Sequence, residues 1–393
     1  MASKTGYQTV CMPEDIIFEI LVRLPVKSLL RFKSVRKSWY AIIKTSDFIR
    51  RHRVNMENSN NTNLGTFVFE YLDHRLAYYC SDIDMAATGL RQFLIVSGEN
   101  SLNGHDNLGL GIIPCLANSS VSMADLTFAG SCHGVLCFYH QDVRKGIVLC
   151  NPTTRHSKLL GKPLGRRSGT CFVAFGFDAI TSDYKVLCVK FFVDAPYYIS
   201  PEIQVYKRST NSWKRINSNF ISAQSCSLDG SKQGRYLNGN YYCIGKQEYQ
   251  TIVSFDFNKE VFRPIPVPSD DCDTWSTDVI QLDSIRDKLV CIKESNRCRG
   301  PTCVKTFKVW VLNDFIANDK NCSWTMLHKF STANEYDRWV PMAISRNKQF
   351  SFISVFNDTK LYNFVTGEIE DWSFGEGIKL TKTDVYKESL ISV

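Results

Sequence analysis

The first 55 residues place their apolar side chains at helical spacing. Pro13, Glu14 and Asp15 begin a helix, because proline needs no backbone donor in the first turn and carboxylates suit the positive end of the helix dipole. Pro25 ends this helix. A surface helix needs one apolar stripe, but this one carries two, made of Ile16, Ile20 and Leu24 and of Phe18 and Val22. Further short helices are predicted at 27–32, 35–43 and 48–54. Such short helices form no independent core, so we expect them to dock on the rest of the chain or on a partner.

From residue 66 onward the pattern changes to short β-branched and aromatic runs separated by Gly, Asn, Asp and Ser, which predicts strands. The runs are Phe67–Glu70, Ile147–Cys150, Val186–Val193, Ile252–Phe257 and Lys305–Leu312. Asn55–Asn63 (NMENSNNTN) has no apolar period and predicts a linker or loop. The expected organisation is a flexible terminus at 1–11, helices at 12–55, a linker at 56–65 and an all-β domain at 66–393.

A strand, a polar turn and a second strand recur five times in the all-β region. The turns begin near Asn151, Asn211, Asn258, Asn313 and Thr366. A repeat of about 50 residues without helices is typical of kelch-type propellers. A less regular unit from Thr66 to about Gly130 would bring the ring to about six blades. A pair of β-sandwiches is the alternative, and the regular spacing favours the closed ring.

The composition is that of an ordinary globular protein, with 393 residues of which 44% are apolar and 22% charged. The leader MASKTGYQTVCMPED lacks the apolar stretch of a signal peptide. No run approaches the roughly 18 apolar residues of a membrane helix. The 15 scattered cysteines are too few for a disulfide scaffold and predict reduced, buried thiols. We therefore expect a soluble protein of the cytoplasm, or also of the nucleus, without membrane contact.

Nearly all of the net charge of +8 lies in the helical segment. Residues 1–55 contain eleven Lys and Arg against four Asp and Glu, a net charge of +7. Such a segment suits nucleic acid, an acidic protein partner or a solvated face. Nucleic-acid modules usually add stacking aromatics or a recognition helix, and neither is visible here. Basic residues interleaved with leucines and a tryptophan favour an acidic, partly apolar protein surface.

No motif indicates an enzyme, a metal centre or a cofactor. Cys132, His133, Cys137 and His140 lie close together, but in a strand-like run Cys137 and His140 point to opposite faces. A buried structural role is therefore favoured over a metal site. Gly239 to Gln247 imitates a phosphate loop, with the wrong spacing and with Gln in place of Ser or Thr. Because there is also no GxSxG elbow, we expect no catalysis by this chain.

The helical segment resembles the F-box of plant F-box proteins. The matching residues are Met12-Pro13-Glu14-Asp15, Ile20-Leu21, Arg23-Leu24-Pro25, Val26–Phe32, Val35, Lys37-Ser38-Trp39, Phe48 and His52. In that family the motif docks on a small acidic Skp-type adaptor, which links it to a cullin scaffold and a RING subunit. The resemblance implies adaptor contacts at Pro13, Ile20, Leu21, Leu24, Pro25, Leu29, Leu30, Val35 and Trp39, with Lys37 at the rim. Some of these must also hold the helices together, and Trp39 suits the core as well as the interface. Arg36 stands where the family commonly has cysteine or serine.

The all-β region resembles the F-box-associated repeat region of the same plant proteins. The matching residues are Gly130–Leu136, Asn151–Arg155, Phe175–Asp178, Asp183–Val186, Tyr206, Ser212-Trp213, Ser254–Asp256 and Ile265–Pro268. Within that group, the chain length and the ending Val385–Leu390 resemble the S-locus F-box branch. Members of that branch act in pollen, and their targets are secreted style ribonucleases.

These features predict the substrate-recognition subunit of a Skp-cullin-F-box ubiquitin ligase. The chain would bring a target to ubiquitination by proximity, followed by proteasomal degradation. Two alternatives stay open: an adaptor-bound binding or sensor module without degradation, and a ligand-binding propeller unrelated to ubiquitin. Loops carry propeller recognition, so the longest irregular segments are either the target-facing side or plain connections. These segments are Ile95–Ala129, Asp194–Pro201, Ser222–Arg235, Ser269–Thr277 and Asn296–Thr302.

Overall fold

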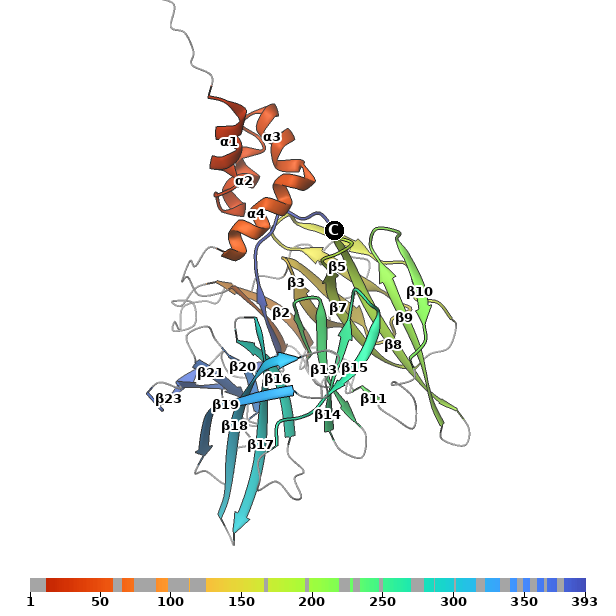
Figure 1. The fold of residues 1–393 in the computed structure, drawn as a ribbon, viewed down its shortest axis with the longest axis vertical. Coiled ribbons are helices and arrows are strands. Elements are labelled where there is room, and N and C mark those ends of the chain that lie inside the picture. The colour runs from red at the N-terminus through yellow and green to blue at the C-terminus, as the bar shows by residue number, and fades with distance from the viewer. Residues whose placement is uncertain are drawn as a thin grey trace, which may run out of the picture.

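In the residues that it describes, the computed structural model has four helices and six β-sheets, and the sheets are arranged in a ring (Figure 1). It describes residues 12–58, 66–73, 90–97, 113, 125–165, 169–194, 198–218, 227–228, 234–246, 250–269, 279–285, 287–299, 302–315, 322–332, 340–344, 349–353, 359–363, 366–372 and 378–393. The expected flexible terminus at 1–11 and residues 59–65 of the expected linker lie outside the described residues. No helix in the described part is long and apolar enough to cross a membrane.

The four helices follow the predicted segments. They are α1 (Glu14–Leu21), α2 (Val26–Phe32), α3 (Lys37–Lys44) and α4 (Ser46–Asn58). Pro13 and Pro25 stand immediately before α1 and α2, where a missing N–H costs nothing. Before α4, the Thr45 hydroxyl accepts a hydrogen bond from the Phe48 N–H at 3.2 Å. α4 runs past residue 55, where the helices were expected to end. Its Asn55 side chain donates to the Val22 carbonyl at 3.2 Å and so ties this part of the helix to the end of α1.

The strands form antiparallel sheets that follow one another along the chain. One sheet contains β1 (Thr66–Asp73), β2 (Leu90–Ser97) and β24 (Ile378–Tyr386). The next two contain β3 (Leu126–Cys132), β4 (Val135–His140), β5 (Ile147–Asn151) and β6 (His156–Leu159), then β7 (Thr170–Asp178), β8 (Asp183–Asp194), β9 (Tyr198–Lys207) and β10 (Ser212–Ile216). A five-stranded sheet contains β11 (Ser227–Leu228), β12 (Arg235–Leu237), β13 (Asn240–Lys246), β14 (Gln250–Asp256) and β15 (Val261–Ile265). The last two contain β16 (Val279–Ile285), β17 (Lys288–Arg299), β18 (Thr302–Phe315) and β19 (Cys322–Thr332), then β20 (Val340–Ile344), β21 (Gln349–Ile353), β22 (Thr359–Asn363) and β23 (Ile369–Trp372).

The inner strands contact one another around the whole ring. β24 contacts β3, β3 contacts β7, β7 contacts β13, β13 contacts β16, β16 contacts β20, and β20 returns to β24. A closed ring of separate antiparallel sheets is a propeller. The predicted propeller of about six blades is therefore confirmed, with five sheets of four or five strands and one of three.

The unit expected from Thr66 to about Gly130 does not form a blade by itself. Its described strands β1 and β2 are completed by β24, which pairs with β1 from Thr66 opposite Tyr386 to Asp73 opposite Ile378. Leu126–Gly130 already belongs to β3 of the next sheet. Pairing the first and last described strands of the propeller in one sheet closes the ring.

The five predicted hairpins are the two outermost strands of five successive sheets, β5–β6, β9–β10, β14–β15, β18–β19 and β22–β23. Equivalent contacts recur in two of them. The indole N–H of Trp213 in β10 donates to the Gly161 carbonyl at 2.6 Å, and that of Trp324 in β19 donates to the Pro266 carbonyl at 2.9 Å. Gly161 lies just after β6 and Pro266 just after β15, the last strands of the sheets that precede those of the two tryptophans. Each tryptophan therefore ties its outer strand to the connection from the sheet before.

Apolar side chains fill the spaces between neighbouring sheets. One cluster joins the sheets of β3–β6 and β7–β10, a second continues to the five-stranded sheet, and a third joins that sheet to β16–β19. Six cysteines are buried in these and the adjoining clusters, where they serve as small apolar side chains: Cys132, Cys137, Cys150, Cys188, Cys243 and Cys291.

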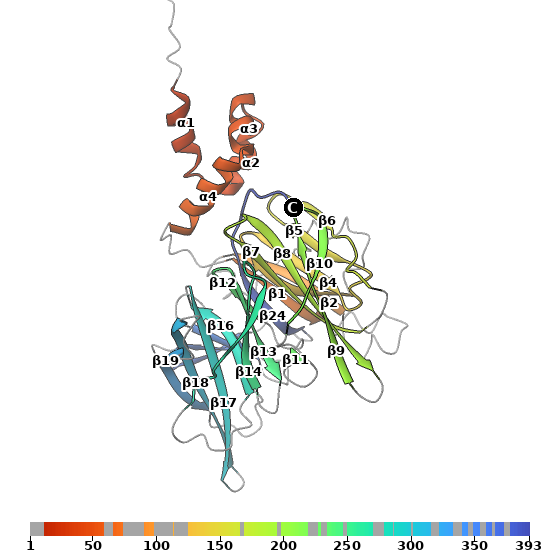
Figure 2. The same cartoon turned by 45° about the vertical axis from the view of Figure 1, so that its right-hand side comes forward.

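Two segments expected to be irregular are regular hairpins instead. β8 continues to Asp194 and β9 begins at Tyr198, with these two residues opposite each other. β17 and β18 likewise pair up to Arg299 opposite Thr302. In Figures 1 and 2 the β17–β18 hairpin projects from the end of the propeller that lies away from the helices. The other three segments fall largely outside the described residues, at 98–112, 114–124, 222–226, 229–233 and 270–277.

Asp384 of β24 carries a charge at the centre of the ring. Its carboxylate accepts the backbone N–H of Ser131 in β3 at 2.9 Å. On the neighbouring inner strands, the positive charge of Arg235 attracts this carboxylate and the negative charge of Asp283 repels it. Burial raises the pKa of Asp384 to about 6, and the attraction of Arg235 offsets this only in part. The folded chain therefore holds this proton more tightly than the unfolded chain. The neutral carboxyl therefore adds to the free energy of unfolding of the propeller below about pH 4, and this contribution is lost as the pH rises through about 6.

We expect Asp384→Asn to stabilise the propeller at pH 7. The amide oxygen can still accept the Ser131 N–H, and the charge is gone, but the amide nitrogen cannot accept the Val385 N–H that the second carboxylate oxygen accepts at 2.9 Å. A net gain of about 1 kcal/mol follows, after allowance for the solvent that still reaches this side chain. Urea unfolding of both proteins at pH 7 and pH 4 measures it, and the gain should vanish at pH 4. An equal gain at both values would contradict the assignment to this carboxyl.

Candidate functional site

The helical segment leaves large apolar side chains exposed at the start of and along α1, between α2 and α3, and on α3. Ile16 and Ile20 are four residues apart on α1, so they share one side of that helix, and each is about half exposed. Val35, between α2 and α3, is 63% exposed. We call Met12, Ile16, Ile20, Val35 and Tyr40 the exposed apolar set. Large apolar side chains left exposed in this number are candidates for an interaction surface.

The two apolar stripes of α1 have different fates. Phe18 and Val22 turn toward the other helices, where the Phe18 ring packs edge-on against Phe48 at 5.2 Å between centroids. The stripe that begins with Ile16 and Ile20 stays exposed. One of the two apolar stripes that the sequence indicated is therefore buried among the helices, and the other leaves Ile16 and Ile20 exposed to solvent.

The residues predicted to contact a partner divide between the surface and the interior. Pro13, Ile20, Pro25, Val35 and Lys37 are exposed, and Leu24, Leu30 and Trp39 are half-buried. Leu21 and Leu29 are 2% and 0% exposed, so they serve the helical core and offer no surface. Trp39 packs on Phe32 with ring centroids 5.3 Å apart. Met12, Ile16 and Tyr40 belong to the exposed apolar set but were not predicted as contacts. The i, i+4 spacing of Ile16 and Ile20 was the available signal.

Several basic side chains of the helices have no carboxylate partner within the described residues. Arg23 pairs with Glu19, Lys27 with Glu388, and Arg50 and Arg51 with Asp47. Within the part of the chain that the structure describes, Arg31, Arg36 and Lys37 form no ion pair. Arg36 and Lys37 directly follow Val35 in the sequence. Positive charge therefore adjoins the most exposed apolar residue of the helices, an arrangement that suits an acidic, partly apolar partner.

The residues that suggested a metal or phosphate site take up structural positions. Cys132 and Cys137 are buried between two sheets, and burial raises the pKa of the Cys137 thiol far above its ordinary value. The His133 ring packs edge-on against Phe177. Within the described residues, no three His, Cys, Asp or Glu side chains gather as metal ligands. Gly239 lies in the turn before β13, and residues 240–246 are a strand.

Comparison with known proteins assigns both parts of the chain. The F-box domain family matches residues 10–51, and the F-box associated beta propeller domain family matches residues 113–393. The F-box/kelch-repeat protein At3g23880 of Arabidopsis thaliana is 26% identical over 336 residues, which cover 84% of this chain and 82% of that protein. The F-box protein At2g21930 of the same plant is 29% identical over 266 residues, covering 65% of this chain and 60% of that protein. The chain therefore belongs to the plant F-box proteins in which an F-box precedes an F-box associated β-propeller domain.

Proposed function

We propose that this chain is the substrate-recognition subunit of a Skp-cullin-F-box ubiquitin ligase. The exposed apolar set and the neighbouring Arg36 and Lys37 bind an acidic Skp-type adaptor, which connects the chain to the cullin and RING subunits. The propeller holds the target. The single observation that carries this proposal is the exposed apolar set on a helical group that otherwise packs a well-filled core.

The chain itself catalyses no step in this proposal. It raises the effective concentration of a target lysine near the conjugating enzyme. The β8–β9 and β17–β18 hairpins support a target site at the end of the propeller away from the F-box, because they extend the surface there (Figures 1 and 2). The ligase would act in the cytoplasm, or also in the nucleus, and deliver its target to the proteasome.

Binding to purified adaptor tests the proposal. We expect the wild-type chain to form a stable one-to-one complex with a Skp-type adaptor and to support ubiquitin transfer once cullin and RING subunits are added. Failure of the wild-type chain to bind any such adaptor would overturn the proposal and favour a ligand-binding propeller unrelated to ubiquitin. If the chain leads its target to degradation, the proteins captured with it should accumulate in cells when the cullin pathway is blocked. If it is a sensor module, their amounts should stay the same.

The S-locus branch gives a candidate target class. The ending Val385–Leu390 and the chain length support it by resemblance. In that case the target is a secreted style ribonuclease taken up by the pollen tube, and the protein acts in self-incompatibility. Expression confined to pollen would agree with this assignment, whereas strong expression in leaf or root would count against it.

Arg36 gives a prediction of its own. It precedes α3 in an extended conformation, and its side chain caps no helix N–H. Serine is a preferred capping residue there, so Arg36→Ser should stabilise the F-box by up to about 1 kcal/mol. The same change removes a cation beside Val35 and should weaken adaptor binding several-fold at low salt. Calorimetric titration at two salt concentrations should show that difference fading as screening increases; an unchanged affinity at low salt would exclude Arg36 from the interface.

A further inference from the structure

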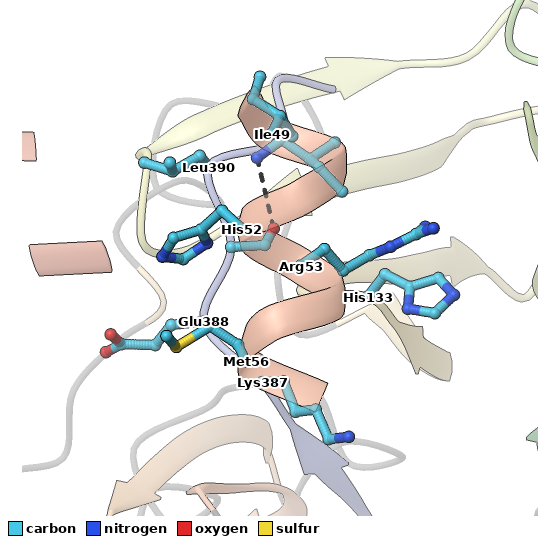
Figure 3. Close-up of a pocket in the computed structure, with 10 residues that line it drawn as sticks. Ile49, His52, Arg53, Met56, His133, Lys387, Glu388 and Leu390 are labelled. Atoms are coloured by element: carbon cyan, nitrogen blue, oxygen red, sulfur yellow. Dashed lines mark hydrogen bonds between the residues drawn. The ribbon is translucent and has the colours of Figure 1, made fainter. Parts of the chain in front are cut away.

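The C-terminal tail, Lys387–Val393, leaves β24 and runs between the propeller and the F-box helices (Figure 3). It has no regular secondary structure, yet Ser389 and Leu390 are buried. We propose that this tail locks the F-box helices onto the propeller and so fixes the position of the adaptor relative to a bound target. The consequence for ubiquitin transfer rests on the proposed function, whereas the lock itself does not.

The tail is held firmly on the propeller side. The side-chain amide of Asn151, at the end of β5, donates to the carbonyls of Ser389 at 3.0 Å and Ile391 at 2.7 Å. Asn151 is completely buried, so these bonds are shielded from water. Arg208 donates to the Ser392 carbonyl at 2.6 Å, and Ile391 and Val393 pack against the cluster between the first two four-stranded sheets.

Gly134 shows how closely the tail lies on the β3–β4 turn. This glycine has φ +79°, and a Cβ there would collide with the Ser389 side chain and the Lys387 carbonyl. A residue with a side chain is therefore excluded on two grounds, by backbone conformation and by space. The turn has the shape needed to seat the tail.

On the other side, Leu390 enters the F-box core. It is 4% exposed and packs in one cluster with Leu21, Leu29 and Phe48. Among the described members of that cluster, it is the one that does not come from residues 12–58. Figure 3 shows Leu390 beside Ile49 and His52 of α4, with Glu388 nearer Met56. Burial of one leucine favours the docked arrangement roughly 10- to 100-fold.

Two charged contacts fix the direction of the docked helices. The Glu388 carboxylate pairs with Lys27 of α2 at 3.1 Å. The guanidinium of Arg53 on α4 lies over the Phe177 ring of β7, 4.8 Å from its centroid. One contact is made by the tail and the other by the propeller, so rotation of the helices about Leu390 would break at least one of them. A fixed orientation holds target lysines within a narrow zone near the conjugating enzyme.

The test compares four full-length chains by small-angle X-ray scattering and amide hydrogen exchange. Leu390→Asp places a charge in the F-box core. Asn151→Asp keeps the oxygen that accepts the Thr153 N–H but removes the donor to the tail and sets a carboxylate against its carbonyls. Ser392→Asp is the matched control, because it adds the same charge at an exposed tail residue.

We expect the wild type and Ser392→Asp to give the same compact profile. Leu390→Asp and Asn151→Asp should show a larger maximum dimension and at least tenfold faster exchange at the tail and the β3–β4 turn. Unchanged scattering in both variants would overturn the lock. If Leu390→Asp loses helical signal, Asn151→Asp decides alone. Adaptor affinity measured on the same proteins keeps the two proposals apart: a wild type that binds no adaptor overturns the ligase role, while the scattering still decides the lock.

Discussion

The double variant Ile20→Asp, Val35→Asp is expected to lose adaptor binding while its fold stays intact. Both side chains are exposed, 47% for Ile20 and 63% for Val35, so the helical core does not need them. Burial of the exposed half of each side chain in a partner would contribute about 1–1.5 kcal/mol, and a carboxylate forced into an apolar contact with an acidic protein adds a further cost. The affinity should therefore fall at least about 100-fold. Titration calorimetry measures the affinity, and circular dichroism confirms the helices.

Two controls separate loss of contact from loss of fold. Val54→Asp changes an apolar residue of α4 that is 42% exposed but lies outside the exposed apolar set, so its affinity should match the wild type. Leu29→Asp places a charge at a fully buried position and should unfold the F-box helices. A double variant that binds as tightly as the wild type would show that the adaptor uses another surface.

The helical segment was largely predictable because its signals are local. Prolines before two helices, acidic residues in a first turn and an i, i+4 pair of isoleucines all lie within a few residues of the feature they specify. Local spacing could not show that Leu21 and Leu29 are internal whereas Ile20 is not. In helices this short, several packings satisfy the same apolar pattern, and only the positions of the neighbouring helices select one of them.

The features that depend on distant residues were not predictable from pattern. β1 pairs with β24 across more than 300 residues, so the first blade looked irregular when judged from its own sequence. Leu390 resembles any apolar residue near a chain end, and nothing local connects it to the core around Phe48. At the ends of the β8–β9 and β17–β18 hairpins, Asp194–Pro201 and Asn296–Thr302 resemble irregular connections in the sequence, because Gly, Pro and polar residues near a hairpin tip also occur in loops.

Lys185 provides the second large effect, at a junction between two blades. Its side chain in β8 is 2% exposed, and the ammonium lies 3.0 Å from the Asp178 carboxylate and 3.1 Å from that of Glu260. It also donates to the Phe257 carbonyl at 2.7 Å. Asp178 ends β7, while Phe257 and Glu260 belong to the turn after β14 in the next sheet. One buried cation thus holds two sheets together.

Lys185→Met should destabilise the propeller by about 3–5 kcal/mol at pH 7, the usual cost of leaving a buried charge without its partner. The melting temperature should fall on the order of 10 °C for a domain of this size. Lys214→Met is the matched control. Lys214 also approaches Glu260, at 3.5 Å, but is 65% exposed, so its loss should cost less than about 1 kcal/mol.

The pH dependence separates the lost ion pair from lost packing. Burial alone would raise the pKa of Asp178, but hydrogen bonds from Thr181 and Lys185 bring it below its ordinary value. Hydrogen bonds from Lys207 and Lys185 likewise lower the pKa of Glu260 against the effect of burial. The stability that these carboxylates contribute is therefore present above about pH 4 and lost as the pH falls further. In Lys185→Met the carboxylates of Asp178 and Glu260 have lost this lysine and are neutralised as the pH falls. The difference in unfolding free energy between the variant and the wild type should therefore narrow between pH 7 and pH 4. A gap of equal size at both values, measured by urea unfolding, would assign the effect to the lost packing of the lysine side chain and contradict the role of the buried charge.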